Sequence, residues 1–487
     1  MDSIQAPTVV MDHDEERLQC PIKGLPVELL RMILEFLPDA SSLYTAVLSC
    51  SLFHSILWGA EEAITAQVVL NQMGAGVLPE AMMAFESAPL RPHNTDPKSR
   101  QAISDYIVQN IQQRPNPPRL CSLRRALYLS RLHFCVDALA KEFAATALAK
   151  HPLSRYSLPS TCQEISRIER ALYRFEIYCN LFRESEKRFA GSESPLNDER
   201  KSLFFANFAP CENEQLGCVL DFLVRTVSPI FNEVAEHDVG WGSANVDYDN
   251  KPDNPYIQSV LSRGLAKIYA ISVAETYEKQ YRALNATKSP HANFGFLCEG
   301  LEYDANEPYN DRVYVEDITP ENETRFIKRP FFKDSDPGPA NAWRWAHIEE
   351  TRSKWVYIED RRELREWGYV MWDQRRLDKV GIFQGPWEDI VSERDLVLED
   401  QEAGREHAYM QNSWEQRESV SMSGGSGWWS WGDRSKVVYK DRGEWALCKR
   451  QWGDHYSPDL KPNSRQEARK MLGLLTLPLS ARKIQGA

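Results

Sequence analysis

Residues 25–39 read LPVELLRMILEFLPD, and this stretch decides the first part of the fold. Pro26 suits the first turn of a helix, because its fixed φ fits there and its missing N–H has no helical partner to lose. Pro38 ends the helix, and the broad apolar face between the two prolines carries Leu29, Leu30, Ile33, Leu34 and Leu37. The stretch therefore predicts a short helix with an unusually wide apolar face.

Two further short helices follow within some 30 residues. Asp39 and Ser41 offer N-cap oxygens to a helix that carries Leu43, Ala46 and Val47. The stretch SLFHSILWGAEEAITAQVVL (51–70) supplies the third, with Leu52, Phe53, Ile56, Leu57 and Ile64. Residues 24–70 thus form a small three-helix module. One interpretation is a generic bundle that fills its own core; the other is that the excess apolar surface binds a partner.

The rest of the chain divides by pattern. Residues 1–23 are polar and aperiodic, which predicts a disordered lead-in. Residues 71–290 form an irregular α-helical body, with helices expected at 122–149, 166–189, 214–237 and 256–284 and Pro-rich joints at 91–97 and 114–119. No fixed repeat indicates a regular solenoid. Turn residues then multiply, so 291–342 is a loop-rich connection.

The C-terminal region, 343–487, is rich in tryptophan. Twelve of the 14 tryptophans lie between Trp343 and Trp452. We expect helices around 357–367 and 388–418, and the aromatic runs at 367–373 and 435–448 allow short strands. The Gly/Ser/Trp stretch 423–433 is expected to form a loop. Most of the tryptophans are spaced as core residues; if any bind a ligand or target, we expect them to be Trp428, Trp429 and Trp431.

Composition excludes several classes of function. The chain has 58 Lys and Arg against 70 Asp and Glu, a net charge of −12, which argues against nucleic acid as a partner. No run of some 18 apolar residues and no signal-like start occurs, so we expect no membrane association. The ten cysteines are scattered without a C-x-x-C pair, which predicts reduced thiols and a cytoplasmic or nuclear, intracellular protein.

No sequence motif favours catalysis. Glu233 and His237 are one helical turn apart, with Glu236 and Asp238 beside them, but no second cluster completes a metal site, so a polar helix end is the better interpretation. His133 and Cys135 diverge around their helix and do not suggest a nucleophile and base. The glycines at 74–76 and 424–427 lack the strand and helix of a phosphate loop. We therefore expect no metal, no cofactor and no enzymatic activity.

The order and spacing of the apolar residues from Leu25 to about Val69 resemble the F-box, the module by which substrate adaptors dock on a Skp-cullin-F-box ubiquitin ligase. Leu25-Pro26, Glu28-Leu29-Leu30, Ile33, Leu37, Leu43 and the run from Val47 to Trp58 carry the resemblance. It implies that the Skp-family adaptor is contacted by Leu25, Pro26, Leu29, Leu30, Ile33, Leu34, Leu37, Leu43, Val47 and Phe53. The segments RALYRFEIYCNLFR (170–183), VAEHDVGWG (234–242) and WGYVMWDQRRL (367–377) look like parts of a large group of fungal F-box proteins.

The sequence thus predicts a mainly α protein with a three-helix F-box head, an irregular helical body and a Trp-rich C-terminal region. The resemblance implies a substrate receptor that binds a Skp-family adaptor and cullin core through its head and an unidentified protein target through the rest. Two alternatives stay open. One is a scaffold that uses the F-box fold without the ubiquitin machinery, and the other is an enzyme whose site lies in the C-terminal region.

Overall fold

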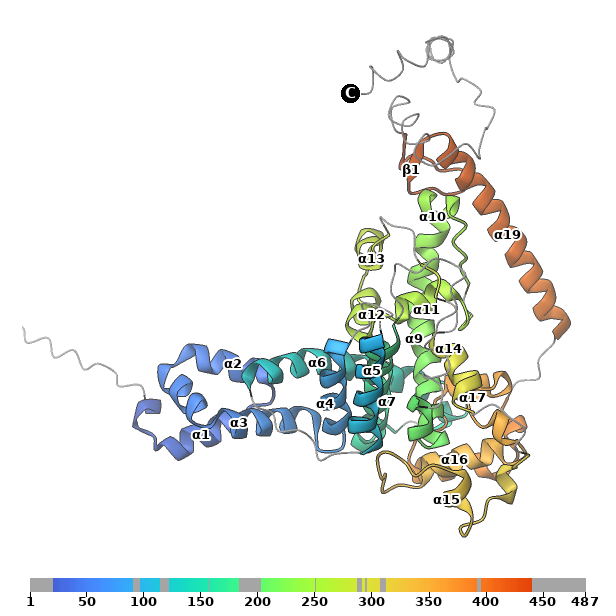
Figure 1. The fold of residues 1–487 in the computed structure, drawn as a ribbon. Helices are drawn as coiled ribbons and strands as arrows, with labels where there is room; N and C mark the ends of the chain where they lie inside the picture. Colours follow the sequence, from blue (N-terminus) through green and yellow to red (C-terminus); the bar gives the residue numbers. More distant parts are fainter. Residues whose placement is uncertain are drawn as a thin grey trace, which may run out of the picture. The chain divides into compact units, whose positions relative to one another are not determined.

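The computed structural model describes residues 21–90, 97–113, 122–156, 158–183, 203–249, 251–286, 291–293, 296–306, 312–391 and 396–439. These residues are mainly helical, which confirms the predicted fold class (Figure 1). They form two compact units that alternate along the sequence. The first contains the chain up to Thr226, Gln258–Ser272 and Asn293–Ser392, and the second contains Val227–Ile257, Val273–Ala292 and the chain from Glu393.

The first unit begins with a three-helix head, defined here as residues 21–60. It consists of η1 (Pro21–Gly24), α1 (Val27–Glu35), α2 (Ala40–Ser49) and the first half of α3 (Ser51–Met73). Pro26 occupies the N-cap position of α1, and the Asp39 carboxylate caps α2 by accepting a hydrogen bond from the Ser42 N–H at 2.8 Å. The predicted starts of both helices are therefore confirmed.

Helix α3 does not end at residue 70, where the sequence placed the head's boundary. It continues to Met73 and bends at Ala60, whose backbone is not helical. Its second half packs against α6, and the Glu61 carboxylate accepts a hydrogen bond from the Leu123 N–H at the start of α6. The head is thus joined to the body by a helix rather than by a linker.

The remaining elements of the first unit are mostly helices of the body and short helical turns. In chain order they are α4 (Leu78–Ser87), η2 (Ala88–Leu90), α5 (Pro97–Tyr106), η3 (Ile107–Gln112), α6 (Leu123–Leu148), η4 (Leu153–Arg155), α7 (Cys162–Phe182), η5 (Phe205–Asn207), the first part of α9 (Pro210–His237), α12 (Leu265–Ser272), α14 (Leu297–Glu299), η6 (Gly300–Asp304), η7 (Val315–Asp317), α15 (Glu323–Phe326), α16 (Gly338–His347), η8 (Arg352–Lys354), η9 (Glu359–Arg361), α17 (Arg362–Glu366), α18 (Gln374–Val380), η10 (Ile382–Gln384) and η11 (Trp387–Asp389).

The second unit combines the end of α9 with α10 (Val239–Ser243), α13 (Tyr277–Leu284), α19 (Leu396–Met422), β1 (Gly425–Gly427) and β2 (Val437–Tyr439). Helix α11 (Pro255–Leu261) begins in this unit and ends in the first. The two strands pair antiparallel and form the only sheet in the described residues. Stretch 423–433, expected to be a loop, therefore contains a strand, because Gly425–Gly427 pairs with the Val437–Tyr439 segment that the sequence did allow as a strand.

Three sequence expectations need correction. The helix expected at 256–284 is divided into α11, α12 and α13, and Gly264 between the first two has a φ of +91°, a left-handed conformation that favours glycine. The helix expected around 357–367 is reduced to η9 and the short α17. The run 367–373 forms buried turns instead of a strand. Residues 440–448 of the other aromatic run lie outside the described part.

Helix α7 is the most buried element of the first unit, although its sequence is rich in charge. A capping box starts it, in which Thr161 and Glu164 each accept a hydrogen bond from the other's backbone N–H. From Arg167 to Phe182 every side chain is buried. Buried ions require partners, and α7 obtains them from segments far away in the sequence.

The ion pairs of α7 follow its length. Arg167 contacts Asp334 at 2.5 Å and Asp373 at 2.7 Å. About two helical turns further along, Arg174 contacts Glu212 at 2.7 Å and Glu80 at 3.2 Å. At the start of the helix, Glu164 receives two hydrogen bonds of 2.8 Å from Arg376. Burial alone would raise the pKa of Glu164, but these hydrogen bonds hold it below its ordinary value.

Glu169 differs from these residues, because no Lys or Arg among the described residues forms an ion pair with it. The Nε2 atom of His133 lies 3.9 Å from its carboxylate, and burial lowers the pKa of that histidine. Burial and the nearby Asp137 raise the pKa of Glu169 to about 7. The folded protein therefore binds a proton here at pH values where the unfolded chain has lost it.

We predict that Glu169→Gln flattens the pH dependence of stability. The raised pKa stabilises the fold fully below about pH 4.5, the ordinary value, and this contribution is lost as pH rises through about 7. The variant should therefore be more stable than the wild type at pH 8 by ~1–3 kcal/mol and about equally stable at pH 4. Urea unfolding at several pH values measures this. If the free energy of unfolding depends on pH in the same way for both proteins, the prediction is contradicted.

In the second unit, the end of α19 packs closely on α10. Arg417 of α19 is fully buried, and its Nη1 donates to the carbonyl oxygens of Ala235 and Asp238 at the end of α9. Gly242 of α10 lies against the Arg417 side chain: a Cβ at this glycine would come within 2.5 Å of the Arg417 Cβ. Val239, Val420 and Trp429 complete the small core beside it.

We predict that Gly242→Ala destabilises the second unit by ~1–3 kcal/mol, because the added methyl group overpacks the contact with Arg417. Gly404→Ala in α19 is the matched control, since nothing lies within 4 Å of its missing Cβ, and alanine favours the helix by up to ~1 kcal/mol over glycine. Denaturant unfolding followed by tryptophan fluorescence should therefore shift in opposite directions for the two variants. A stability loss in both would contradict the close-packing argument.

Candidate protein-docking surface

Helix α1 has two apolar sectors that face different surroundings. Leu30 and Leu34 are fully buried and form the head's core with side chains from α2 and α3. A second sector, rotated by about a quarter turn or more around an ideal helix, is open to solvent. Its members are exposed by 37% (Leu25), 46% (Leu29), 47% (Met32), 42% (Ile33) and 76% (Phe36). We call these five side chains the open sector.

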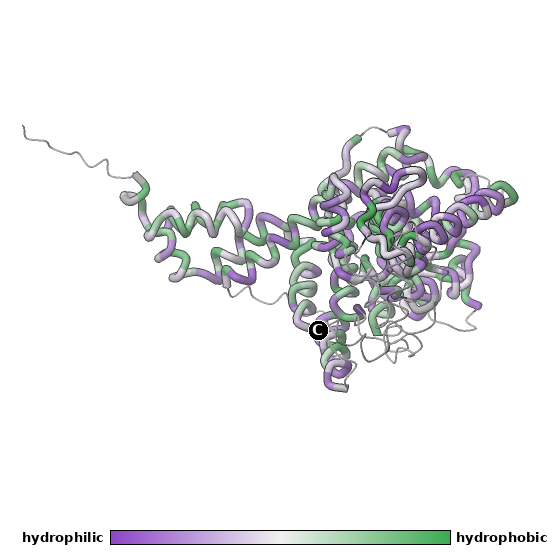
Figure 2. Tube along the Cα trace, turned by 90° about the horizontal axis from the view of Figure 1, so that it is seen from above, coloured by the Kyte–Doolittle hydropathy of each residue, from purple (hydrophilic) through white to green (hydrophobic). Residues whose placement is uncertain are grey.

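Charged residues of α1 occupy the remaining part of the helix circumference. Glu28, Arg31 and Glu35 share this side, and Arg31 forms an ion pair with Glu35 at 2.7 Å. The open sector is therefore not a mixed surface with single apolar side chains, which would need no explanation, but a continuous stripe at helical spacing. Figure 2 shows hydrophobic (green) stretches within the head.

Other helices of the head also expose large apolar side chains. On α2, Tyr44 and Leu48 are one turn apart and exposed by 44% and 67%. On α3, Trp58 is 68% exposed, and its indole Nε1 donates a hydrogen bond of 2.9 Å to His54 Nε2. This bond holds the Trp58 ring in place at the surface.

The structure divides the ten side chains predicted to contact an adaptor. Leu25, Pro26, Leu29 and Ile33 are exposed, and Leu37 is half-buried against the head's core. The other five are buried inside the head: Leu30, Leu34, Leu43, Val47 and Phe53. They are core residues rather than surface residues, because each lies on the side of its helix that faces the other two helices.

Sequence reasoning missed several exposed side chains of the head. Met32 and Phe36 continue the stripe of Leu25 and Leu29 at spacings of three and four residues, and this signal was present in the sequence. Tyr44, Leu48 and Trp58 gave no such signal. Their exposure follows from the packing of α2 and α3, which only the structure shows.

The tryptophans proposed for target binding lie in the second unit and differ in exposure. Trp431 is 43% exposed, and its Nε1 donates to the Tyr409 hydroxyl at 3.0 Å. Trp428 is half-buried and stacks on His237 with ring centres 4.7 Å apart. Trp429, by contrast, is 2% exposed and belongs to the core. The prediction of an exposed Trp429 is wrong: its backbone N–H donates to the His237 carbonyl at 2.7 Å, and its side chain packs in the small core with Val239 and Val420.

The polar cluster at the end of α9 forms contacts within the fold. His237 Nε2 lies 4.0 Å from Glu233. The Asp238 carboxylate caps α10 by accepting from the Trp241 N–H at 2.7 Å, and Glu236 accepts from the Tyr409 hydroxyl at 2.7 Å. No group of three or more metal-ligating side chains occurs in the described part of the chain.

His133 and Cys135 point to different surroundings, as expected from their spacing. His133 Nδ1 contacts the hydroxyl of buried Tyr173 at 3.1 Å. The Cys135 thiol donates to the Arg131 carbonyl, and burial raises its pKa, which disfavours the reactive thiolate.

Comparison with known protein families, with curated proteins and with solved structures finds no match to this chain. Among the helices described, none combines the length and apolar character that crossing a bilayer requires.

Proposed function

We propose that this protein is the substrate-receptor subunit of a Skp-cullin-F-box ubiquitin ligase, with the head as its F-box. The observation that carries the proposal is the open sector on a three-helix head, because three of its five side chains, Leu25, Leu29 and Ile33, are among those that the F-box resemblance implies for adaptor contact. The head would bind the Skp-family adaptor as an apolar helix face set into a groove. The rest of the chain would hold a protein target close to the conjugating enzyme, so that proximity supplies the rate enhancement.

The energetics favour a partner for the open sector. Burying one Leu, Ile, Met or Phe side chain contributes about 1.5–3 kcal/mol. The open sector, with Leu29, Met32 and Ile33 in α1, Phe36 at its C-cap and Leu25 just before it, is therefore a substantial source of binding free energy. The charged side of α1, with Glu28, Arg31 and Glu35, would remain at the rim in contact with water. Such an arrangement of an apolar centre and a charged rim is typical of protein interfaces.

The target would be contacted outside the head. Trp431 and Trp428 are candidates, since one is exposed and the other half-buried, whereas Trp429 acts through folding of the second unit. Aromatic side chains of this kind bind with little loss of conformational entropy.

We predict that Leu29→Ala/Ile33→Ala weakens binding of the full-length chain to a purified Skp-family adaptor by about tenfold or more, because each truncated interface side chain costs ~1–3 kcal/mol. Alanine keeps the helix propensity high, and both side chains are exposed, so thermal unfolding should change little. Isothermal titration calorimetry gives the affinity and circular dichroism gives the melting curve.

Two controls make this test specific. Leu158→Ala removes an equally apolar, 53% exposed side chain from another part of the first unit and should leave adaptor affinity unchanged. Leu34→Ala removes a core side chain and should lower stability by ~2–5 kcal/mol. A folded Leu29→Ala/Ile33→Ala variant with undiminished affinity would contradict docking through the open sector.

The ligase role needs its own measurement. If the full-length chain is a receptor, a cullin should copurify with it through the adaptor, and proteins bound to the chain should accumulate when it is deleted from cells. Adaptor binding without a cullin would favour the alternative of an F-box-fold scaffold.

A further inference from the structure

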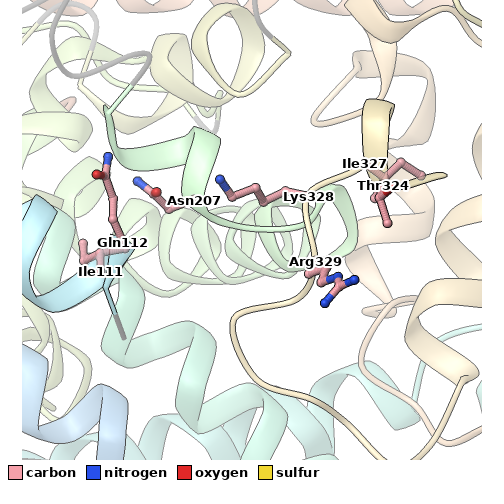
Figure 3. Close-up of a pocket in the computed structure, with 7 residues that line it drawn as sticks. All are labelled: Ile111, Gln112, Asn207, Thr324, Ile327, Lys328 and Arg329. Atoms are coloured by element: carbon pink, nitrogen blue, oxygen red, sulfur yellow. The ribbon is translucent and has the colours of Figure 1, made fainter. Parts of the chain in front are cut away.

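The first unit contains a hollow that the docking surface does not include. Its volume is about 540 Å³, and it is lined by Ile111, Gln112, Asn207, Thr324, Ile327, Lys328 and Arg329 (Figure 3). The lining residues come from η3, from η5 and from the segment around the end of α15, which are more than 90 residues apart in sequence. This volume falls within the range of about 300–1,000 Å³ that is common for sites of small organic ligands.

The base of the hollow is well supported. Ile111 is fully buried, and Asn207 is 4% exposed, with its side-chain amide donating to the Phe204 carbonyl at 3.4 Å. Phe204 and Phe205 beside it pack edge to face, 5.3 Å between ring centres, and extend into the aromatic core around Tyr178. The wall can therefore bind a ligand without first being ordered.

The charge of the lining is one-sided. It includes two cations, Lys328 and Arg329, and no carboxylate, in a chain whose net charge is −12. Lys328 forms no ion pair with any carboxylate of the described residues, and Figure 3 shows its side chain extending toward Asn207. The nearest acidic neighbour in sequence, Glu323, is directed to Arg344 instead, at 3.7 Å.

The remaining lining groups suit the rest of such a ligand. Gln112 and Thr324 are exposed and can form hydrogen bonds with polar atoms, and Ile327 is half-buried next to the lysine. Apolar surface from half-buried Ile327 can cover hydrocarbon, while the ammonium group of Lys328 pairs with negative charge.

We propose that this hollow binds a small organic anion, with its carboxylate or phosphate group at Lys328 and its apolar part against Ile327. The proposal is independent of the docking surface, since none of these residues belongs to the head. It assigns the hollow a ligand class by charge and shape together: an anion without an apolar part, or an apolar molecule without charge, would use only half of the lining.

The test uses the full-length chain and ligand-observed NMR titrations up to ~10 mM, with hexanoate and phenyl phosphate as probes. Hexanol and hexylammonium are the neutral and cationic controls, and acetate tests the contribution of the apolar part. Saturable binding of either anion, at least several-fold tighter than that of the controls, supports the proposal. The relative affinities of the two probes distinguish carboxylate from phosphate ligands.

Variants place the binding at this hollow. Lys328→Glu should weaken binding of the preferred probe about tenfold, which corresponds to ~1.4 kcal/mol, and Ile327→Ala should weaken hexanoate more than acetate. Lys354→Glu introduces the same charge change at an exposed lysine of the first unit outside the hollow and should have less than about a twofold effect. Failure of both anions to saturate, equal binding of hexanol, or equal losses in the two charge-reversal variants would overturn the proposal.

Discussion

Pairing of buried charges on α7 is the interaction on which the first unit depends. An arginine removed from water is costly unless a carboxylate and further hydrogen bonds compensate for the lost hydration. Arg167 and Arg174 meet this requirement with carboxylates from both sides in sequence, such as Glu80 and Asp334, 94 and 167 residues away. Each of these arginines contacts two carboxylates from different segments, so removing either arginine would leave two buried carboxylates without that partner, and the contacts act together. They select one arrangement of α4, α9 and the segment before α16 around α7.

The sequence predicts the helices better than it predicts this arrangement. Apolar periodicity is a local signal, and it located α1, α6 and α9 to within about four residues. The helix expected at 166–189 is α7, which begins four residues earlier and already ends at Phe182. Burial of the charged side chains of α7 has no local signal, since a pattern of charges does not reveal which of them has a distant partner. The sequence also failed to predict the short helix α17 and the turns around 367–373. Their conformation depends on burial against the long helices, which is not a local signal.

For the candidate site, too, the sequence predicted the helix but not which of its side chains are exposed. On α1 the sequence identified a face that is too wide for one core, but it could not tell Leu29, which is exposed, from Leu30, which is buried. That difference depends on the direction from which α3 approaches, and no spacing rule contains it. Trp429 is the converse case. A Gly/Ser-rich context favoured exposure, while packing against Val239 and Val420, from segments remote or outside that context, buried the ring. Lys328 had no motif around it, because its neighbours in the hollow come from remote segments.

The continuity of α3 between head and body has a mechanical consequence. A ligase whose receptor parts were joined by a flexible linker would present its target at an effective concentration set by chain statistics, spread over many distances. Helix α3 instead continues beyond the head from Glu61 to Met73, which is about 20 Å at 1.5 Å per residue. Within the proposed function, α3 would thus fix the distance between an adaptor bound at the head and the rest of the first unit, and target lysines would be modified according to their position.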